Sequence, residues 1–301
     1  MAPWKQFRGT GTAIVTPFKS DRSLDEKALR KLVEFQIKGG VEALIPVGTT
    51  GESPTLDYEE HFRVFDVVIA TAAGRVKIFA GTGSNNTAEA IEQTQYARKA
   101  GADAALVVGP YYNKPTQEGY FQHYRAIAEG VDIPIIVYNV PGRTGGNIEA
   151  ATTLRMAEEI PNIVAVKEAS GNLAQIMEIA RHKPRNFSLL SGDDAITLPM
   201  MALGGDGCIS VVANEVPRDF SEMVRQALKG NFEKARALHN KLLPLMNINF
   251  IEANPVPVKA ALAMMGMIEE VYRLPLVPIS PANRAKLTTV LRELKLLRTP
   301  R

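Results

Sequence analysis

The chain has 301 residues, of which 46% are hydrophobic and 22% are charged, and its formal net charge is +3. This composition is ordinary for a globular protein, and no long run of like charges suggests a nucleic-acid partner or a polybasic membrane anchor. With one cysteine, Cys208, an intramolecular disulfide and a multi-cysteine zinc site are both excluded. No apolar run reaches the roughly 18 residues of a membrane span, so we expect a soluble cytoplasmic protein.

Short apolar runs alternate with longer stretches of helical periodicity over the first 230 residues. Continuous apolar runs are typical of parallel strands that are buried on both faces. The predicted strands are 12–16, 43–47, 76–80, 104–108, 135–138, 163–167, 188–191 and 208–212. The predicted helices between and after them are 24–38, 58–73, 87–99, 116–129, 148–159, 173–182, 195–203 and 216–229.

Side chains that suit helix termini mark several of these boundaries. Ser23, Asp57 and Thr116 are expected to accept hydrogen bonds from the first turns of three helices, as N-caps do. Glycines that follow predicted helices, and that can adopt the left-handed conformation of a C-cap, are the pair Gly39-Gly40, Gly74, Gly101 and Gly130.

Eight such units in succession predict a closed (β/α)8 barrel formed by residues 1–230. Three further helices, 232–250, 256–267 and 281–297, are expected to form a C-terminal extension, residues 231–301, packed on the barrel. A doubly wound sheet is the structural alternative, but it usually has fewer strands and carries a dinucleotide loop. The segment Gly81-Thr82-Gly83 lacks the third glycine of that loop.

Lys167 carries the strongest indication of chemistry. It closes an apolar strand, and in such barrels the active site lies where the strands end at their carboxyl side. Desolvation there favours the neutral amine, which is the nucleophilic form of lysine. Ile163 and Ala165 are expected to share its side of the strand, because side chains alternate. The alternative is a structural lysine that pairs with Glu168 at the strand end.

Tyr138 closes the preceding strand, one βα unit before Lys167. Neighbouring strands lie about 4.8 Å apart, so the two side chains can meet at the barrel mouth. A phenol beside an amine can transfer protons during imine formation. The alternative is a packed tyrosine whose hydroxyl has a purely structural hydrogen bond.

Two loops at the same end of the barrel contain groups that suit an anion. The segment 48–53 offers hydroxyls and free backbone N–H groups before a predicted helix, without the lysine of a Walker loop. Arg143 lies in a glycine-rich loop, where its guanidinium could bind a carboxylate or remain solvated. The four histidines are scattered, so no metal site is predicted.

Three motifs in this order, Gly48-Thr49-Thr50-Gly51-Glu52, the segment 138–145 (YNVPGRTG) and Val166-Lys167-Glu168-Ala169, resemble the pyruvate-dependent class I aldolase superfamily of N-acetylneuraminate lyase. Within it, the chain is most similar to the dihydrodipicolinate synthase family, over about residues 7–292. The resemblance implies a Schiff-base lyase of lysine and diaminopimelate biosynthesis. It would condense pyruvate with L-aspartate 4-semialdehyde on a homotetramer, without a metal or organic cofactor.

The resemblance also implies a role for individual residues. Lys167 would form the imine, and Tyr138 would transfer protons together with Thr49 and with Tyr112 from the adjacent subunit. The residues implied in substrate binding are Thr50 for the pyruvate carboxylate, Arg143 for the semialdehyde carboxylate, and Gly192 and Ile209 as backbone positions of the pyruvate pocket. The positions that match a lysine effector site are Ser53, His61, Asn85, Glu89 and Tyr111.

Two other functions remain open at this point. A sialic-acid or 2-keto-3-deoxy sugar-acid lyase would use the same lysine, although such enzymes usually lack an arginine at the position of Arg143. A barrel that binds keto acids as a sensor, without catalysis, would have little need for Lys167, Tyr138 and Thr49 together.

Overall fold

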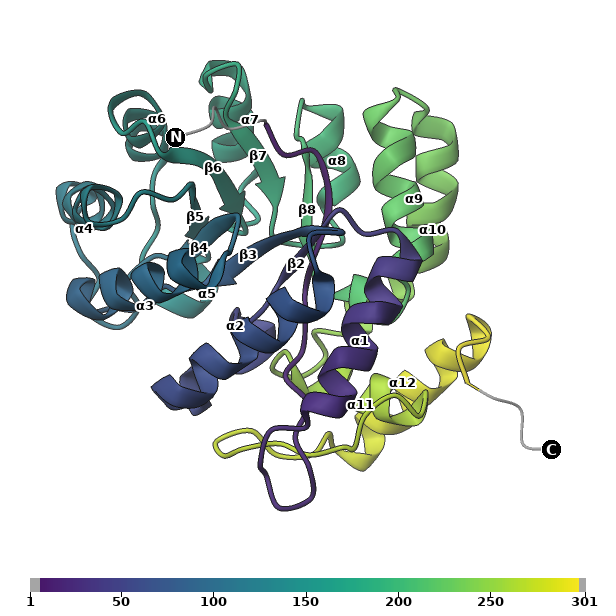
Figure 1. The fold of residues 1–301 in the computed structure, drawn as a ribbon. Helices are drawn as coiled ribbons and strands as arrows, with labels where there is room; N and C mark the ends of the chain where they lie inside the picture. The colour runs from purple at the N-terminus through teal and green to yellow at the C-terminus, as the bar shows by residue number, and fades with distance from the viewer. Residues whose placement is uncertain (1–5, 298–301) are drawn as a thin grey trace.

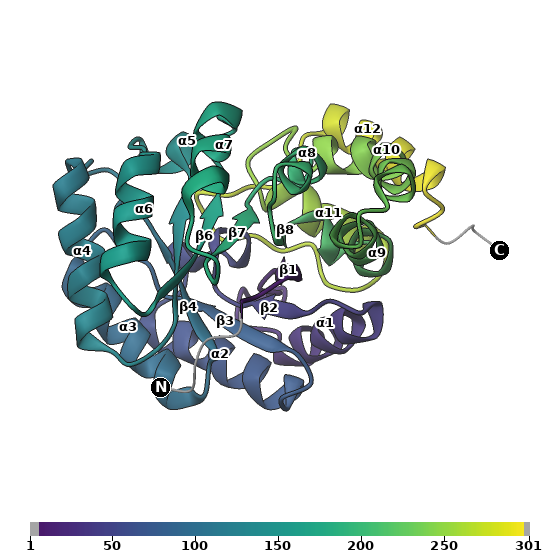
Figure 2. The same ribbon diagram turned by 90° about the horizontal axis from the view of Figure 1, so that it is seen from above.

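The structure is a computed structural model that describes residues 6–297. Its parallel strands close into a barrel in which each strand pairs with the next and β8 returns to β1. The strands are β1 Gly9–Ala13, β2 Ala43–Ile45, β3 Lys77–Gly81, β4 Ala104–Val108, β5 Ile135–Asn139, β6 Ile163–Glu168, β7 Ser188–Ser191 and β8 Gly207–Ser210. Helices surround the strands (Figure 1 and Figure 2), so the predicted (β/α)8 barrel is confirmed.

The helices follow the predicted order, with differences at their ends. They are α1 Glu26–Gly39, α2 Tyr58–Ala72, α3 Thr87–Ala100, α4 Gln117–Gly130, α5 Pro141–Thr144, α6 Ala150–Glu159, α7 Leu173–His182, α8 Thr197–Ala202, α9 Pro217–Leu228, α10 Phe232–Ile248, α11 Val256–Met264 and α12 Pro281–Glu293. The single-turn helix α5 was expected to be a loop. Short 3-10 helices η1 Thr49–Gly51, η2 Ser53–Thr55 and η3 Val212–Asn214 lie in the loops after β2 and β8.

Strands β1 and β8 end earlier than predicted, although the residues that follow are apolar. Val15 donates its backbone N–H to the side chain of Asn214 (3.2 Å). Val211 and Val212 donate theirs to one carboxylate oxygen of Asp194 (3.1 and 2.8 Å). Because side chains satisfy these buried donors, the backbone can leave the sheet at the barrel mouth without an unpaired N–H group.

The N-caps Asp57 and Thr116 are confirmed, whereas Ser23 is not a cap. Asp25 caps α1 by accepting from the backbone N–H of Ala28, so the helix begins later than predicted. The left-handed C-caps at Gly40 and Gly101 are confirmed.

The two other C-cap predictions are wrong. Ala73 occupies the left-handed cap of α2, one residue before Gly74. Gly130 is the last helical residue of α4, and an extended residue follows it.

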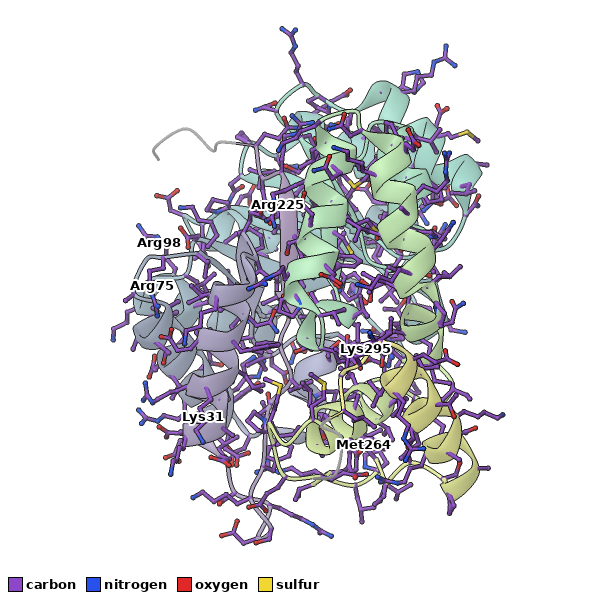
Figure 3. All side chains as sticks on the ribbon, turned by 90° about the vertical axis from the view of Figure 1, so that its right-hand side faces the viewer. Lys31, Arg75, Arg98, Arg225, Met264 and Lys295 are labelled. Carbon is purple, nitrogen blue, oxygen red and sulfur yellow. The ribbon has the colours of Figure 1, made fainter. Side chains whose placement is uncertain are left out.

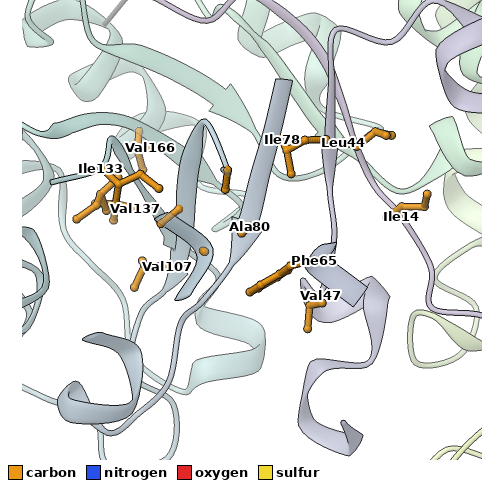
Figure 4. Packing of buried hydrophobic residues seen from close by; sticks show 14 of the residues in the cluster. Ile14, Leu44, Val47, Phe65, Ile78, Ala80, Val107, Ile133, Val137 and Val166 are labelled. Atoms are coloured by element: carbon orange, nitrogen blue, oxygen red, sulfur yellow. The ribbon is translucent and has the colours of Figure 1, made fainter. Parts of the chain in front are cut away.

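Two apolar layers lie on the two sides of the strands. The inner layer fills the barrel and includes Ala165, Ile209 and Tyr138. The outer layer joins the strands to the helices around them, and Figure 4 shows part of it. A register shift in β6 places Ile163 in the outer layer, so the expectation that it shares the side of Lys167 is wrong.

The C-terminal helices share a second hydrophobic cluster with helices α8 and α9 of the barrel. Phe220 and Val224 of α9 pack in this cluster with Leu242 of α10 and Leu287 of α12. Figure 3 shows α9 and α10 side by side, with Met264 of α11 below them. Over the described residues, no helix combines the length and apolar character needed to cross a bilayer.

Candidate active site

Lys167 and Tyr138 meet where β6 and β5 end. The two residues are paired in the register of the strands, and each is 6% exposed. The Lys167 Nζ atom lies 4.0 Å from the centre of the Tyr138 ring. The expected contact at the barrel mouth is therefore present.

Glu168 points to the other side of β6, as the alternation of side chains requires. Its fully buried carboxylate accepts hydrogen bonds from Asn139 (3.0 Å), Gln175 (3.1 Å) and the backbone of Ser170 (2.6 Å). Within residues 6–297, Lys167 forms no ion pair. The alternative of a structural Lys167–Glu168 pair is therefore wrong.

A cavity of about 130 Å³ opens beside Lys167. Its lining consists of Thr49, Thr50, Tyr138, Val140, Arg143, Lys167, Ala169, Gly192, Asp193, Val211, Phe250 and Asn254. A Cβ atom on Gly192 would lie 3.0 Å from Cε of Lys167 and 2.7 Å from Cβ of Ala169. Glycine at this position therefore leaves room for the lysine side chain.

Three of the lining residues come from the loops that were expected to bind anions. Thr49 and Thr50 lie on η1, and the backbone of this loop is held by a hydrogen bond from Thr16 Oγ1 to the carbonyl of Gly51 (2.7 Å). Arg143 lies on α5, where the carbonyl of Val140 accepts from its backbone N–H (2.9 Å). Arg143, which was predicted to lie in a glycine-rich loop, thus belongs to a one-turn helix.

Two predicted site residues are not part of this lining. Ile209 packs in the inner layer of the barrel, and Val211 lines the cavity on that side. Tyr112 follows β4 and is 88% exposed, with a left-handed backbone conformation (φ 72°). A role for Tyr112 in catalysis therefore requires a second subunit to bring it to a site.

A second cavity, of about 390 Å³, collects most of the predicted effector positions. Ser53, His61, Glu89 and Tyr111 line it. Asn85 is outside the lining and donates to the backbone carbonyl of Tyr111 (3.1 Å).

The electrostatics of this second cavity suit a cationic group. Burial lowers the pKa of His61, which keeps its ring neutral, and its Nε2 lies 3.0 Å from the carbonyl of Gly81. Glu89 is the acidic residue among the predicted effector positions. Its carboxylate accepts a hydrogen bond from the Ser84 hydroxyl (2.7 Å). Thr49, Val140 and Arg143 line both cavities, so the two sites adjoin.

Sequence reasoning missed Asn254, Phe250 and Asp193. Asn254 and Phe250 lie in the connection between α10 and α11, far in sequence from any strand end. The rule that places barrel sites at strand ends therefore does not predict them. Asp193 directly follows Gly192 after β7, where the rule applies, and it was overlooked.

A closed eight-strand barrel with a buried lysine beside a tyrosine at its mouth is the arrangement of a lyase of the class I aldolase type. The sequence profile of the dihydrodipicolinate synthetase family matches residues 6–294. The chain therefore belongs to the dihydrodipicolinate synthetase family.

Individual relatives agree with this over the whole chain. The 4-hydroxy-tetrahydrodipicolinate synthase of Koribacter versatilis is 57% identical over 294 residues, covering 97% of this chain and 98% of the relative. The same enzyme of Chlorobium phaeobacteroides (strain BS1) is 54% identical over 293 residues, covering 97% and 99%.

Solved structures share the fold closely. Dihydrodipicolinate synthase from Aquifex aeolicus has a TM-score of 0.95 at 49% identity, covering 97% of this chain and all of that one. The chloride-inhibited enzyme of Acinetobacter baumannii, complexed with pyruvate, has a TM-score of 0.95 at 47% identity, covering 97% and 100%. The enzyme of Cyanidioschyzon merolae with lysine bound has a TM-score of 0.95 at 42% identity, covering 98% and 100%.

Proposed function

We propose that the protein is a 4-hydroxy-tetrahydrodipicolinate synthase that works through an imine on Lys167. The observation that carries this proposal is the Lys167 amine, which lies at the cavity against the Tyr138 ring and has no carboxylate partner within residues 6–297. A buried amine that is not engaged in an ion pair and that faces a cavity can reach the keto carbon of a substrate bound there.

The reaction follows from this arrangement. The Lys167 nitrogen adds to the keto carbon of pyruvate, and loss of water gives the imine. The positive nitrogen withdraws electrons, so the pyruvate methyl group loses a proton and an enamine forms. The enamine carbon then bonds to the aldehyde carbon of L-aspartate 4-semialdehyde, and the aldehyde oxygen gains a proton. Tyr138, with Thr49, transfers protons in these steps.

Different residues bind the carboxylates of the two substrates. Thr50, with the backbone of Thr49, binds the pyruvate carboxylate, and Gly192 leaves the space that Lys167 occupies. Arg143, at the opening shared by both cavities, binds the carboxylate of the second substrate. A planar guanidinium suits a carboxylate better than a sugar hydroxyl chain, which favours the semialdehyde over a polyhydroxylated aldehyde.

The remaining parts of the proposal concern assembly and control. Tyr112 completes the proton transfer from a second subunit in a homotetramer, and the protein acts in the cytoplasm. The second cavity is a lysine effector site in which Glu89 receives the ammonium group; Ser53, His61, Asn85 and Tyr111 surround it.

Trapping with borohydride tests the central step. Incubation with pyruvate and sodium borohydride should add one reduced pyruvate to Lys167, as peptide mass spectrometry would show, and Lys167→Ala should take up none. Absence of the adduct in the wild-type protein would contradict the imine.

Turnover assays then test the second substrate. Condensation of pyruvate with L-aspartate 4-semialdehyde should be catalysed, and Arg143→Ala should weaken use of the semialdehyde. Cleavage of N-acetylneuraminate or 2-keto-3-deoxygluconate without use of the semialdehyde would favour a sugar-acid lyase. Binding of pyruvate without either reaction would favour a sensor.

A further inference from the structure

Asn254 lines the cavity beside Lys167 but has no role in the proposed reaction. It is 5% exposed and lines the cavity from the C-terminal extension. The other polar side chains of the lining lie at the ends of barrel strands or in the loops that follow them. A polar side chain that is buried in an active site is expected to have a hydrogen-bond partner there.

The side chain of Asn254 is bonded to Thr50. Its Nδ2 donates to Thr50 Oγ1 at 3.0 Å, and within residues 6–297 this is the only hydrogen bond of either side chain. Since Thr50 Oγ1 accepts from the amide, the hydroxyl hydrogen is left to point at another acceptor. Once a keto acid has lost its keto oxygen as water on forming the imine with Lys167, the acceptor that it supplies in this cavity is its carboxylate.

The backbone of Asn254 is bonded to Arg143. Its carbonyl accepts from the Arg143 guanidinium at 3.2 Å. One residue of the extension therefore contacts both groups that bind carboxylates, and these groups come from the loops after β2 and β5.

The position of Asn254 relative to the β2 loop is fixed by a second connection. Lys259, five residues further along, forms a fully buried ion pair with Glu52, which is two residues from Thr50. The carbonyl of Val256, between them, accepts from the Tyr272 hydroxyl (3.0 Å). The Asn254–Thr50 hydrogen bond is thus made between two segments that are already held together.

We propose that Asn254 is a positioning residue that orients the Thr50 hydroxyl as a donor to the pyruvate carboxylate and holds Arg143 over the same cavity. This inference rests on the proposed function. It predicts that the Asn254 side chain affects pyruvate binding through the Thr50 hydroxyl, and only through it.

A double-mutant cycle tests the proposal. The readout is the pyruvate concentration at which half of Lys167 is trapped by borohydride. Asn254→Ala and Thr50→Val should each raise it about fivefold to tenfold, as expected for one lost hydrogen bond. The double variant should be no worse than Thr50→Val alone, whereas Asn254→Ala in a Thr50→Ser background should keep its effect. Additive effects of Asn254→Ala and Thr50→Val would overturn the proposal.

A charge variant tests the polarity of the hydrogen bond. Asn254→Asp keeps the shape of the side chain but offers only acceptors, so it would take the Thr50 hydroxyl hydrogen and place a negative charge near the bound carboxylate. The half-trapping concentration should then rise about a hundredfold. Unchanged trapping in Asn254→Asp would mean that the amide does not donate to Thr50, and the proposal would fail.

Glu252→Ala is the matched control. Glu252 lies two residues away and accepts from Ser280 (2.7 Å) and Asn283 (2.7 Å), outside the cavity. It should leave pyruvate trapping as in the wild type. If it reproduced the effect of Asn254→Ala, a general loosening of the segment would explain both variants. A wild-type protein that forms no adduct would instead contradict the proposed function itself.

Discussion

In the proposed reaction, the phenol of Tyr138 and the amine of Lys167 have different roles. The amine would form the bond to the substrate, whereas the phenol would only transfer protons. The ring of Tyr138 also contacts the amine, and a phenylalanine would keep this contact. The two functions of the tyrosine can therefore be separated by removing one oxygen atom.

Tyr138→Phe should lower turnover by about 10²–10⁴-fold, the usual contribution of a general acid or base. Pyruvate trapping on Lys167 at long incubation should persist, because the ring and the amine remain in place. Steady-state kinetics with both substrates, beside the trapping assay, would check this. Turnover at the wild-type rate would remove Tyr138 from the mechanism.

A second residue-scale feature is the buried pair Glu215 and Asn249. Asn249 Nδ2 donates to one Glu215 oxygen at 2.6 Å. The other Glu215 oxygen and the Asn249 amide oxygen are buried and have no partner among the described residues. Burial raises the pKa of Glu215 well above its ordinary value, and the nearby Asp194 carboxylate raises it further. A protonated Glu215 can give its hydrogen to the unpaired amide oxygen.

A carboxyl with a raised folded-state pKa binds protons more tightly in the folded state than in the unfolded one. Its contribution to stability is therefore complete below the unfolded pKa and is lost as pH rises toward the folded pKa. Glu215→Gln removes the titration and keeps a hydrogen-bonding amide. Its Tm should match the wild type at about pH 4, below the ordinary pKa of a glutamate, and exceed it by about 2 °C or more at about pH 8. A lower Tm at both pH values, measured by calorimetry, would contradict this account.

At the scale of elements, two layers of contacts align the ends of β5 and β6. Tyr138 faces Lys167 inside the barrel, and the next residues, Asn139 and Glu168, are hydrogen-bonded on the outside. The alternation of side chains along a strand thus places the Tyr138–Lys167 pair on one side of the sheet and the Asn139–Glu168 pair on the other. The loop after β2 is held in a different way, by the buried ion pair of Glu52 with Lys259 of α11.

This ion pair predicts a strong asymmetry between single and double variants. Lys259→Met leaves a buried carboxylate without a partner, which costs about 3–5 kcal/mol in free energy of unfolding. Glu52→Gln combined with Lys259→Met removes both charges and should recover most of that loss. Urea denaturation would measure the difference. A double variant as unstable as Lys259→Met would show that the charge itself is not the cause.

The second cavity joins the loop after β2 to the N-terminal part of α3. If Glu89 receives the ammonium group of lysine there, Glu89→Gln should raise the lysine concentration for half inhibition about tenfold, since a charged hydrogen bond becomes a neutral one. Initial rates with increasing lysine would measure this. A wild-type protein that lysine does not inhibit would remove the effector role from this cavity.

At the scale of the whole molecule, the exposed Tyr112 is the residue whose proposed role needs a second chain. Mixed oligomers can test it. Lys167→Ala and Tyr112→Phe should each be nearly inactive alone. If Tyr112 acts in the neighbouring site, a mixed dimer contains one site with both native residues, and random mixing should restore about a quarter of the wild-type activity.

The two variant chains must assemble together for this measurement, so they should be co-expressed with different tags. The mixed dimer purified by both tags should then have about half of the wild-type activity, because one of its two sites is native. Mixing of two copies of the Lys167→Ala chain with different tags is the control. Mixed oligomers that stay inactive would place Tyr112 outside the neighbouring site.

The extension also belongs to this scale. Its helices α10 and α12 share one hydrophobic cluster with α8 and α9 of the barrel. We propose that residues 231–301 do not fold independently of residues 1–230, because each part covers apolar surface of the other.

The chain order of strands and helices, the closed barrel and the places of Lys167 and Tyr138 could be predicted from sequence alone. These features depend on local periodicity and on one rule of the fold, that parallel strands end at a common mouth. Helix ends and strand ends were predicted less well at Ser23, Gly130 and β1. Those boundaries depend on which side chain reaches a free backbone group.

Only the tertiary structure decided which residues from distant segments complete the site. Asn254 reaches Thr50 across more than 200 positions of the chain, and Lys259 reaches Glu52 in the same way. The residues around Asn254 and Lys259 in the sequence do not predict these contacts, because the partner of a buried polar side chain can lie anywhere in the chain. The strands determine where the site lies. Long-range hydrogen bonds determine how the groups around it are held, and the periodicity of the sequence does not predict them.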